Sequence, residues 1–156
     1  MKISVALCTH NGEKYILPQL ESIAKQTILP DEIVICDDRS TDDTVQLIES
    51  YVAFAPFKIC LYKNETNLGS TKNFEKALLL CGGEIIFFCD QDDSWLPKKV
   101  ESVIKYFENN NRKKVVFTNA FIVDDNRVVT TSLWNQIGFN KKSQEQWMKG
   151  MLLNTW

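Results

Sequence analysis

A chain of 156 residues has the usual size of a single domain, so one continuous hydrophobic core is expected. Apolar residues make up 44% of the chain and charged residues 24%, which excludes a disordered, collagen-like or fibrous protein. The 18 basic and 20 acidic residues leave a net charge of −2, which argues against nucleic acid as a partner because non-specific binding to it depends on a strong positive field.

Five short apolar runs, rich in Ile, Val and Phe, predict β-strands. They lie at residues 3–8, 32–36, 58–62, 84–89 and 115–118. Nearly continuous hydrophobicity is typical of parallel strands that are buried on both faces. The centres of successive runs lie 26 or 30 positions apart, which is the spacing of consecutive βα units.

Helical patterns with apolar residues at i and i+3 or i+4 separate these runs, and they begin near Ile16, Val45, Phe74 and Val100. Residues 40–43 (STDD) supply capping groups for the second helix, and Pro97 fits the first turn of the fourth. Residues 82–83 (GG) are expected to end the third helix. The fold class predicted is α/β, with a mainly parallel sheet flanked by helices.

The pattern changes after residue 118. Residues 121–129 read as a β-hairpin appended to the parallel core, with polar residues at its turn. Residues 143–153 predict a last helix, and apolar surface around Trp147, Met151 and Trp156 predicts self-association.

Cysteine usage bears on the compartment. The five cysteines are Cys8, Cys36, Cys60, Cys81 and Cys89. All lie in or beside apolar runs without CxxC spacing, so we interpret them as buried free thiols in a reducing compartment. The sequence has no charged-then-apolar leader, and residues 82–84 interrupt the longest apolar stretch short of a membrane span. We therefore expect a cytoplasmic protein, with peripheral contact to the inner face of a membrane left open.

Polar segments follow three of the predicted strands. Residues 9–12 (THNG) follow the first strand, residues 37–40 (DDRS) the second and residues 90–93 (DQDD) the fourth. In open α/β sheets, ligands bind beyond the carboxyl ends of the strands. Adjacent like charges are costly unless a cation or a hydrogen-bond donor offsets them, so these segments indicate a binding site that includes a metal ion.

Asp90 and Asp92 are separated by one residue, so a turn after the strand can direct both carboxylates to one point. These are hard oxygen ligands for Mg²⁺ or Mn²⁺, which keep coordination sites open for substrate phosphates. A diphosphate is therefore the implied ligand group. The alternative is that residues 90–93 form a solvated turn and cap the next helix, but the two other polar segments favour a binding site.

Other nucleotide-binding devices are missing, because no GxxxxGK[ST] loop or GxGxxG turn follows a predicted strand. A P-loop NTPase and an ordinary dinucleotide dehydrogenase therefore lose support. Asp37 or Asp38 could accept a hydrogen bond from a ring N–H of a base, or could instead cap the following helix. A phosphoreceiver domain is disfavoured, because it needs an acidic pair after the first strand, where residues 9–11 are THN.

The segments resemble, in order, the motifs of the inverting glycosyltransferases of family 2, which have the GT-A fold and transfer sugars from nucleotide diphosphate donors. Residues 3–12 resemble the family's first strand and Thr-Tyr-Asn turn, with His10 where Tyr is usual. Residues 35–42 resemble its Asp-Asp-Gly-Ser segment, residues 67–74 its third segment and residues 88–97 its Asp-x-Asp segment. The resemblance covers residues 3–130 and is strongest to the rhamnosyltransferase-like branch, which carries Asp-Gln-Asp-Asp followed by Trp.

The resemblance implies roles for individual residues. Asp38 would lie near the ring N–H of the base with Asp37 beside it, and His10 would flank the base. Asp92 would bind the metal, with Asp90 near the ribose and the metal. The other residues implied in the nucleotide-sugar site are Cys8, Thr9, Asn11, Lys72 and Gln91.

The resemblance also implies a Mn²⁺ or Mg²⁺ cofactor, a UDP- or dTDP-sugar donor, and a saccharide or lipid-linked saccharide acceptor in polysaccharide biosynthesis. Residues 1–130 would form the nucleotide-sugar-binding GT-A core, and residues 131–156 an incomplete C-terminal segment of the same domain. The family's catalytic base, an Asp or Glu, lies past the hairpin and finds no match before Trp156. Asp124 and Asp125 are interpreted as solvated turn residues, so the catalytic residue stays unassigned.

Two hypotheses follow. The first is a metal-assisted inverting glycosyltransferase of the hexosyltransferase type, in which an acceptor hydroxyl displaces the nucleoside diphosphate. The alternative is a truncated, non-catalytic module that binds the nucleotide sugar and the metal.

Overall fold

A computed structural model describes residues 1–110, 114–124 and 128–140. The chain divides into two compact units, Met1–Asn111 and Arg112–Trp156, and each is described by itself. The boundary expected at residue 130 falls inside the second unit, and it stays a prediction. The helix expected at residues 143–153 and the apolar surface around Trp147 lie outside the described residues.

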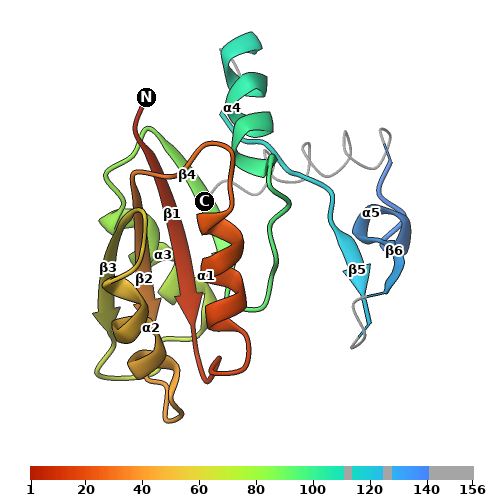
Figure 1. The fold of residues 1–156 in the computed structure, drawn as a ribbon. Helices are drawn as coiled ribbons and strands as arrows, with labels where there is room; N and C mark the ends of the chain where they lie inside the picture. Colours follow the sequence, from red (N-terminus) through yellow and green to blue (C-terminus); the bar gives the residue numbers. More distant parts are fainter. Residues whose placement is uncertain (111–113, 125–127, 141–156) are drawn as a thin grey trace, which may run out of the picture. The chain divides into compact units, whose positions relative to one another are not determined.

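A four-stranded parallel sheet forms the centre of the first unit (Figure 1). Its strands are β1 (Ile3–Thr9), β2 (Glu32–Asp37), β3 (Lys58–Lys63) and β4 (Ile85–Asp90), in the order β3-β2-β1-β4. All residues of β1 and β2 are buried, as their continuous hydrophobicity predicts. At the edges, β3 and β4 are partly exposed, so burial on both faces is confirmed for the two central strands alone.

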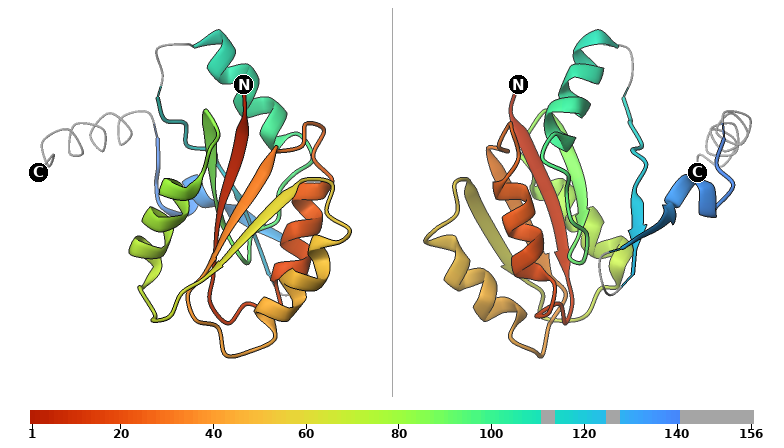
Figure 2. Two further views of the ribbon diagram at one scale, coloured as in Figure 1. Left: turned by 90° about the vertical axis from the view of Figure 1, so that its left-hand side faces the viewer. Right: turned by 45° about the vertical axis from the view of Figure 1, so that its right-hand side comes forward.

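Four helices flank this sheet in two layers: α1 (Ile16–Ala24), α2 (Thr44–Val52), α3 (Ser70–Leu80) and α4 (Lys99–Asn109). The strand residues that face α1, α2 and α4 form the larger core cluster, which includes Val5, Leu7 and Ile35. Alternate residues such as Ala6 and Cys36 form a second cluster with Ala77 of α3. Figure 2 shows α3 on one face of the sheet and α1 and α2 on the other. The predicted α/β class and its GT-A arrangement of a parallel sheet between helices are confirmed.

The connection from α3 to β4 depends on a close approach. Helix α3 ends at Leu80, and Cys81 is already extended, so the two glycines follow the helix rather than forming its last turn. A Cβ at Gly83 would lie 2.7 Å from the backbone nitrogen of Ser4 and 3.0 Å from the carbonyl oxygen of Lys2. Glycine is therefore needed here because the chain passes against β1, not because of a left-handed turn.

The second unit contains a hairpin of β5 (Phe121–Val123) and β6 (Val129–Ser132), which pair antiparallel with an irregularity near Val123. This confirms the appended hairpin. A short helix that the sequence did not predict, α5 (Leu133–Gln136), follows β6. The strand expected at residues 115–118 is wrong: this segment forms no strand, and Val115 is 63% exposed.

All five cysteines are free thiols, as expected. Cys8, Cys36 and Cys89 are buried, whereas Cys60 and Cys81 are half-buried because they lie at the margin of the layer under α3. Within the described ranges, no helix combines the length and the apolar character that crossing a membrane requires.

Candidate functional site

The carboxyl ends of β1, β2 and β4 meet at one end of the sheet. The hydroxyl of Thr9 donates to Asp37 Oδ2 at 2.9 Å, and the backbone N–H of Asp38 donates to the carbonyl oxygen of Thr9 at 2.8 Å. On the other side, the backbone N–H of His10 donates to Oε1 of Gln91 at 2.9 Å. The structure therefore brings the three polar segments together, as the parallel topology requires.

The side chain of Asp37 is buried, with an exposed fraction of 1%, and it connects segments inside the protein. Besides the hydroxyl of Thr9, its carboxylate accepts the backbone N–H and the hydroxyl of Ser40. These bonds hold the turn after β2, in which Arg39 has a left-handed φ of 64°. Both carboxylate oxygens of Asp37 accept hydrogen bonds inside the protein, and its role in nucleotide-sugar binding stays a prediction.

Asp38 holds the loop between β3 and α3. Its Oδ1 accepts the backbone N–H of Leu68 at 2.7 Å and the amide of Asn64 at 2.8 Å, and its Oδ2 accepts the N–H of Gly69 at 2.9 Å. Burial alone would raise the pKa of Asp38, but these hydrogen bonds outweigh it and the pKa is lowered. A carboxylate has about four acceptor positions, so Oδ2 keeps room for one more donor.

A network of amide side chains surrounds Asp38, and the sequence reasoning missed it. The amide of Asn64 also donates to Asn73 Oδ1 at 2.9 Å, and Asn73 in turn donates to the carbonyl oxygen of Cys36 at 2.8 Å. The ammonium group of Lys76 donates to Asn64 Oδ1 at 2.7 Å. Asn73 lies in the third segment of the resemblance, but nothing in the pattern indicated that it is buried beneath the site.

His10 is exposed and its ring is held in one tautomer. Its Nδ1 lies 2.9 Å from the carbonyl oxygen of Asp38, which can only accept, so Nδ1 carries the proton. In the neutral ring Nε2 is then an acceptor, and the amide of Asn11 lies 3.5 Å from it. An exposed, oriented ring of this kind can lie against the face of a base.

Asn11 fixes the turn that carries His10. Its φ is 48°, a left-handed conformation that Asn tolerates, and its backbone N–H donates to the hydroxyl of Ser40. Its side-chain oxygen accepts the backbone N–H of Thr41 at 2.8 Å. The next residue, Gly12, donates its N–H to the hydroxyl of Thr44 at 2.7 Å, so the turn is tied to the start of α2.

Three carboxylates with little to offset them lie at the end of β4 and in the loop after it. Burial, followed by the charges of Asp93 and Asp92, raises the pKa of Asp90. Burial also raises the pKa of Asp93, although Lys99 counteracts it. An unbalanced set of hard oxygen donors fits a divalent cation, for which one or two carboxylates plus substrate phosphates are the usual ligands. Among the described residues, no group of three or more His, Cys, Asp or Glu side chains is placed to hold a metal by itself.

Two predicted site residues lie elsewhere than in this hydrogen-bonded cluster. Cys8 belongs to the buried layer under α3, and burial raises its pKa to about 12, so it stays a neutral thiol. Lys72 is exposed on α3, where it lines an open hollow of about 380 Å³ together with Leu68 and Lys76. Their roles in nucleotide-sugar binding stay predictions.

Residues 4–155 match the family described as glycosyl transferase family 2. The chain is 30% identical over 80% of its length to "Putative glycosyltransferase EpsE" of Bacillus subtilis, of which it covers 45%. It is 31% identical over 81% of its length to "UDP-Glc:alpha-D-GlcNAc-diphosphoundecaprenol beta-1,3-glucosyltransferase WfgD" of Escherichia coli, of which it covers 49%. The chain thus belongs to glycosyl transferase family 2, and it spans less than half the length of each of these relatives.

Solved structures agree with this assignment. The crystal structure of S. aureus TarS 1-349 in complex with UDP matches with a TM-score of 0.64 and 30% identity, over 82% of this chain and 43% of that one. The mannosyltransferase PcManGT from Pyrobaculum calidifontis, in complex with GDP-Man and Mn²⁺, matches with a TM-score of 0.65 and 21% identity, over 79% and 36% of the two chains. The latter likeness supports the fold alone.

Proposed function

We propose that this chain carries the donor site of a glycosyltransferase that moves a sugar from a UDP or dTDP donor to an acceptor hydroxyl with inversion. One observation carries the proposal: the ends of β1, β2 and β4 form a single hydrogen-bonded cluster, from Thr9 and Asp37 across to Gln91, beside the carboxylates of Asp90 and Asp92. Family membership and the UDP complex of the TarS structure support the same donor chemistry.

The chain's own residues divide the work on the donor. The exposed ring of His10 flanks the base, and the free acceptor position on Asp38 Oδ2 receives a ring N–H. Asp90 and Asp92 would hold Mg²⁺ or Mn²⁺, which supplies positive charge to stabilise the departing diphosphate. Inversion follows from a single displacement of the diphosphate by the acceptor hydroxyl.

For the acceptor we propose a saccharide or lipid-linked saccharide, as in polysaccharide biosynthesis at the cytoplasmic face of a membrane. The relative WfgD, whose printed name includes a diphosphoundecaprenol-linked sugar, supports this class. The DQDD segment followed by Trp95 supports a rhamnosyltransferase-like branch.

His10 provides a direct test of donor binding, because it is the chain's single histidine and its ring gives one set of NMR signals. Addition of UDP with Mg²⁺, which is diamagnetic, is expected to shift the ring resonances with a saturating dependence on concentration, and calorimetry on the same sample gives the affinity. Saturable binding that leaves the His10 ring unchanged would contradict the placement of the base.

A further inference from the structure

Gln91 lies between the two carboxylates that the proposed function assigns to the metal, yet its side chain points to another strand end. Its Oε1 accepts the backbone N–H of His10 at 2.9 Å, and its Nε2 donates to the carbonyl oxygen of His10 at 3.1 Å. One primary amide therefore satisfies both backbone groups of a single residue.

This contact joins the ends of β1 and β4 one step beyond the last residues that pair through their backbones. β1 and β4 are in parallel register up to Cys8 and Asp90, after which the two chains diverge into their loops. The amide of Gln91 takes the place of the backbone partner that His10 would otherwise lack on this side. The opposite side of the same turn is held from β2 through the carbonyl oxygen of Asp38.

Gly12 makes room for this amide. A Cβ at Gly12 would lie 2.5 Å from Cδ of Gln91, 3.2 Å from its Nε2 and closer still to its Oε1. All three nearest atoms thus belong to one side chain. Gly12 does not have a positive φ, so a Cβ here would conflict with the end of the Gln91 side chain rather than with the backbone conformation.

We propose that Gln91 is a positioning residue that connects the segment of Asp90 and Asp92 to the turn carrying His10. Gly12 leaves the space that the amide of Gln91 occupies. The inference rests on the proposed function, in which His10 flanks the base and residues 90 and 92 hold the metal. Gln91 acts through the backbone of His10, so the base and the diphosphate are received at a fixed separation.

The test compares two glutamines with similar contacts at different places. Gln26 also pairs its amide with the backbone, donating to the carbonyl oxygen of Leu96 at 2.8 Å and accepting the N–H of Val100 at 3.0 Å. It follows α1 and contacts the start of α4 and the residues just before that helix, away from the cluster at the strand ends. Q91A is expected to weaken binding of UDP with Mn²⁺ about tenfold through two lost hydrogen bonds, whereas Q26A lowers the melting temperature and leaves the affinity unchanged.

A double-mutant cycle tests the fit between Gly12 and Gln91. G12A forces the amide of Gln91 out of place, so it is expected to weaken UDP binding in the parent chain and to add no further loss to Q91A. Q91A and G12A are each expected to shift the His10 ring resonances before nucleotide is added, and Q26A is not.

Three results overturn the inference: an affinity of Q91A equal to that of the parent, an equal loss in Q26A, or an equal effect of G12A with and without Gln91. A parent chain that binds no UDP with Mn²⁺ would instead contradict the proposed function, and the inference with it. Measuring the binding of UDP with Mn²⁺ by the parent chain distinguishes these two failures.

Discussion

Glu32 lies at the amino end of the sheet, opposite the candidate site, and is the best-satisfied carboxylate there. It accepts hydrogen bonds from the hydroxyl of Ser4 at 2.7 Å, from the backbone N–H of Gly82 at 2.8 Å and from the ammonium group of Lys2 at 3.0 Å. The hydrogen bond from Ser4 is the main cause that lowers the pKa of Glu32 from 4.5 to about 2. Its charge therefore stabilises the folded chain.

The first prediction concerns pH. Because the pKa of Glu32 is lower in the folded chain than in the unfolded chain, its stabilisation is complete above about pH 4.5 and is lost as the pH falls toward 2. E32Q is expected to reduce the free energy of unfolding by about 1–3 kcal/mol at pH 7, with a difference that shrinks below pH 4.5. Urea unfolding across this range measures it.

The control for this experiment is E49Q. Glu49 pairs with Lys63 at 2.6 Å, but both side chains are about half exposed, so E49Q should reduce the free energy of unfolding by less than about 1 kcal/mol. Glu49 takes no part in the hydrogen bonds around Glu32. Equal losses in the two variants would show that the hydrogen bonds around Glu32 add nothing to an ordinary surface ion pair.

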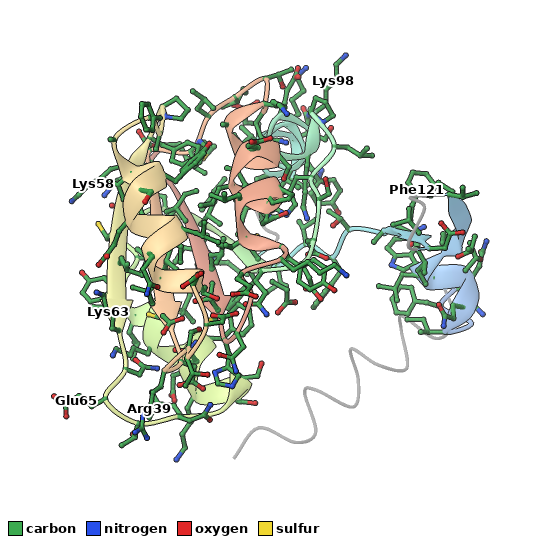
Figure 3. All side chains as sticks on the ribbon, turned by 60° about the horizontal axis from the view of Figure 1, so that its bottom comes forward. Arg39, Lys58, Lys63, Glu65, Lys98 and Phe121 are labelled. Atoms are coloured by element: carbon green, nitrogen blue, oxygen red, sulfur yellow. The ribbon has the colours of Figure 1, made fainter. Side chains whose placement is uncertain are left out.

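The second prediction concerns the metal. D92A is expected to weaken the binding of Mn²⁺ together with UDP by about tenfold or more, because a cation that loses a carboxylate ligand keeps too few protein oxygens. Glu65 provides a matched control, since it is an exposed carboxylate at the same end of the molecule (Figure 3). If D92A binds Mn²⁺ and UDP as tightly as E65A in calorimetry, the metal assignment is wrong.

At the scale of single residues, the sequence indicated which side chains gather but not what they contact. The position of His10 and Asp38 after parallel strands predicts that they lie at one rim. The hydrogen bonds from Leu68, Gly69 and Asn64 to Asp38 depend on how the loop after β3 folds back. Such long-range contacts leave no periodic signal, so the bracing role of Asp37 and Asp38 could not be predicted.

At the scale of elements, the third prediction concerns the α3–β4 connection. G83A is expected to destabilise the chain by about 1–3 kcal/mol, because the new Cβ would lie 2.7 Å from the backbone nitrogen of Ser4, which cannot move without disturbing β1. At Gly82 the nearest atom, 2.9 Å away, is the flexible end of Lys2, so G82A should be tolerated. Thermal unfolding compares the two, and equal melting temperatures would contradict this account.

The four strands and four helices of the first unit were predicted within one or a few residues at their ends. Their apolar periodicity is strong because each element buries one face or both. Residues 115–118 have the same apolar character but form no strand, and Phe117 is 49% exposed. An apolar run does not reveal whether a neighbouring strand is present to pair with it, and the run near Val115 is too short to decide.

At the scale of the whole molecule, the fourth prediction is that residues 1–156 bind a nucleoside diphosphate without efficient sugar transfer. Among the described residues of the cluster, Asp37 and Asp38 accept internal hydrogen bonds, the remaining position on Asp38 is proposed for the base, and Asp90 and Asp92 are assigned to the metal. Neither the hydrogen bonds of the cluster nor the resemblance assigns a carboxylate, Asp93 included, to take the acceptor's proton, a role worth about 10²- to 10⁴-fold in rate.

Two measurements on one sample separate binding from transfer. UDP with Mn²⁺ should raise the melting temperature in proportion to affinity. Release of nucleoside diphosphate from a UDP-sugar should show little dependence on added saccharide acceptor. Rapid release that requires the acceptor would show that residues 1–156 contain a base and would refute the prediction.

The edge of the sheet at β3 has a consequence for solubility. An edge strand offers unpaired backbone groups to any other chain that presents a strand, which is how edge-to-edge aggregation begins. β3 is bracketed by Lys58 and Lys63, both exposed, one at each end of the strand (Figure 3). Lys63 is paired with Glu49, so a second copy approaching this edge in line would have to remove this ion pair and the charge of Lys58 from water. The charged groups at both ends of β3 therefore oppose pairing of this edge with a second copy.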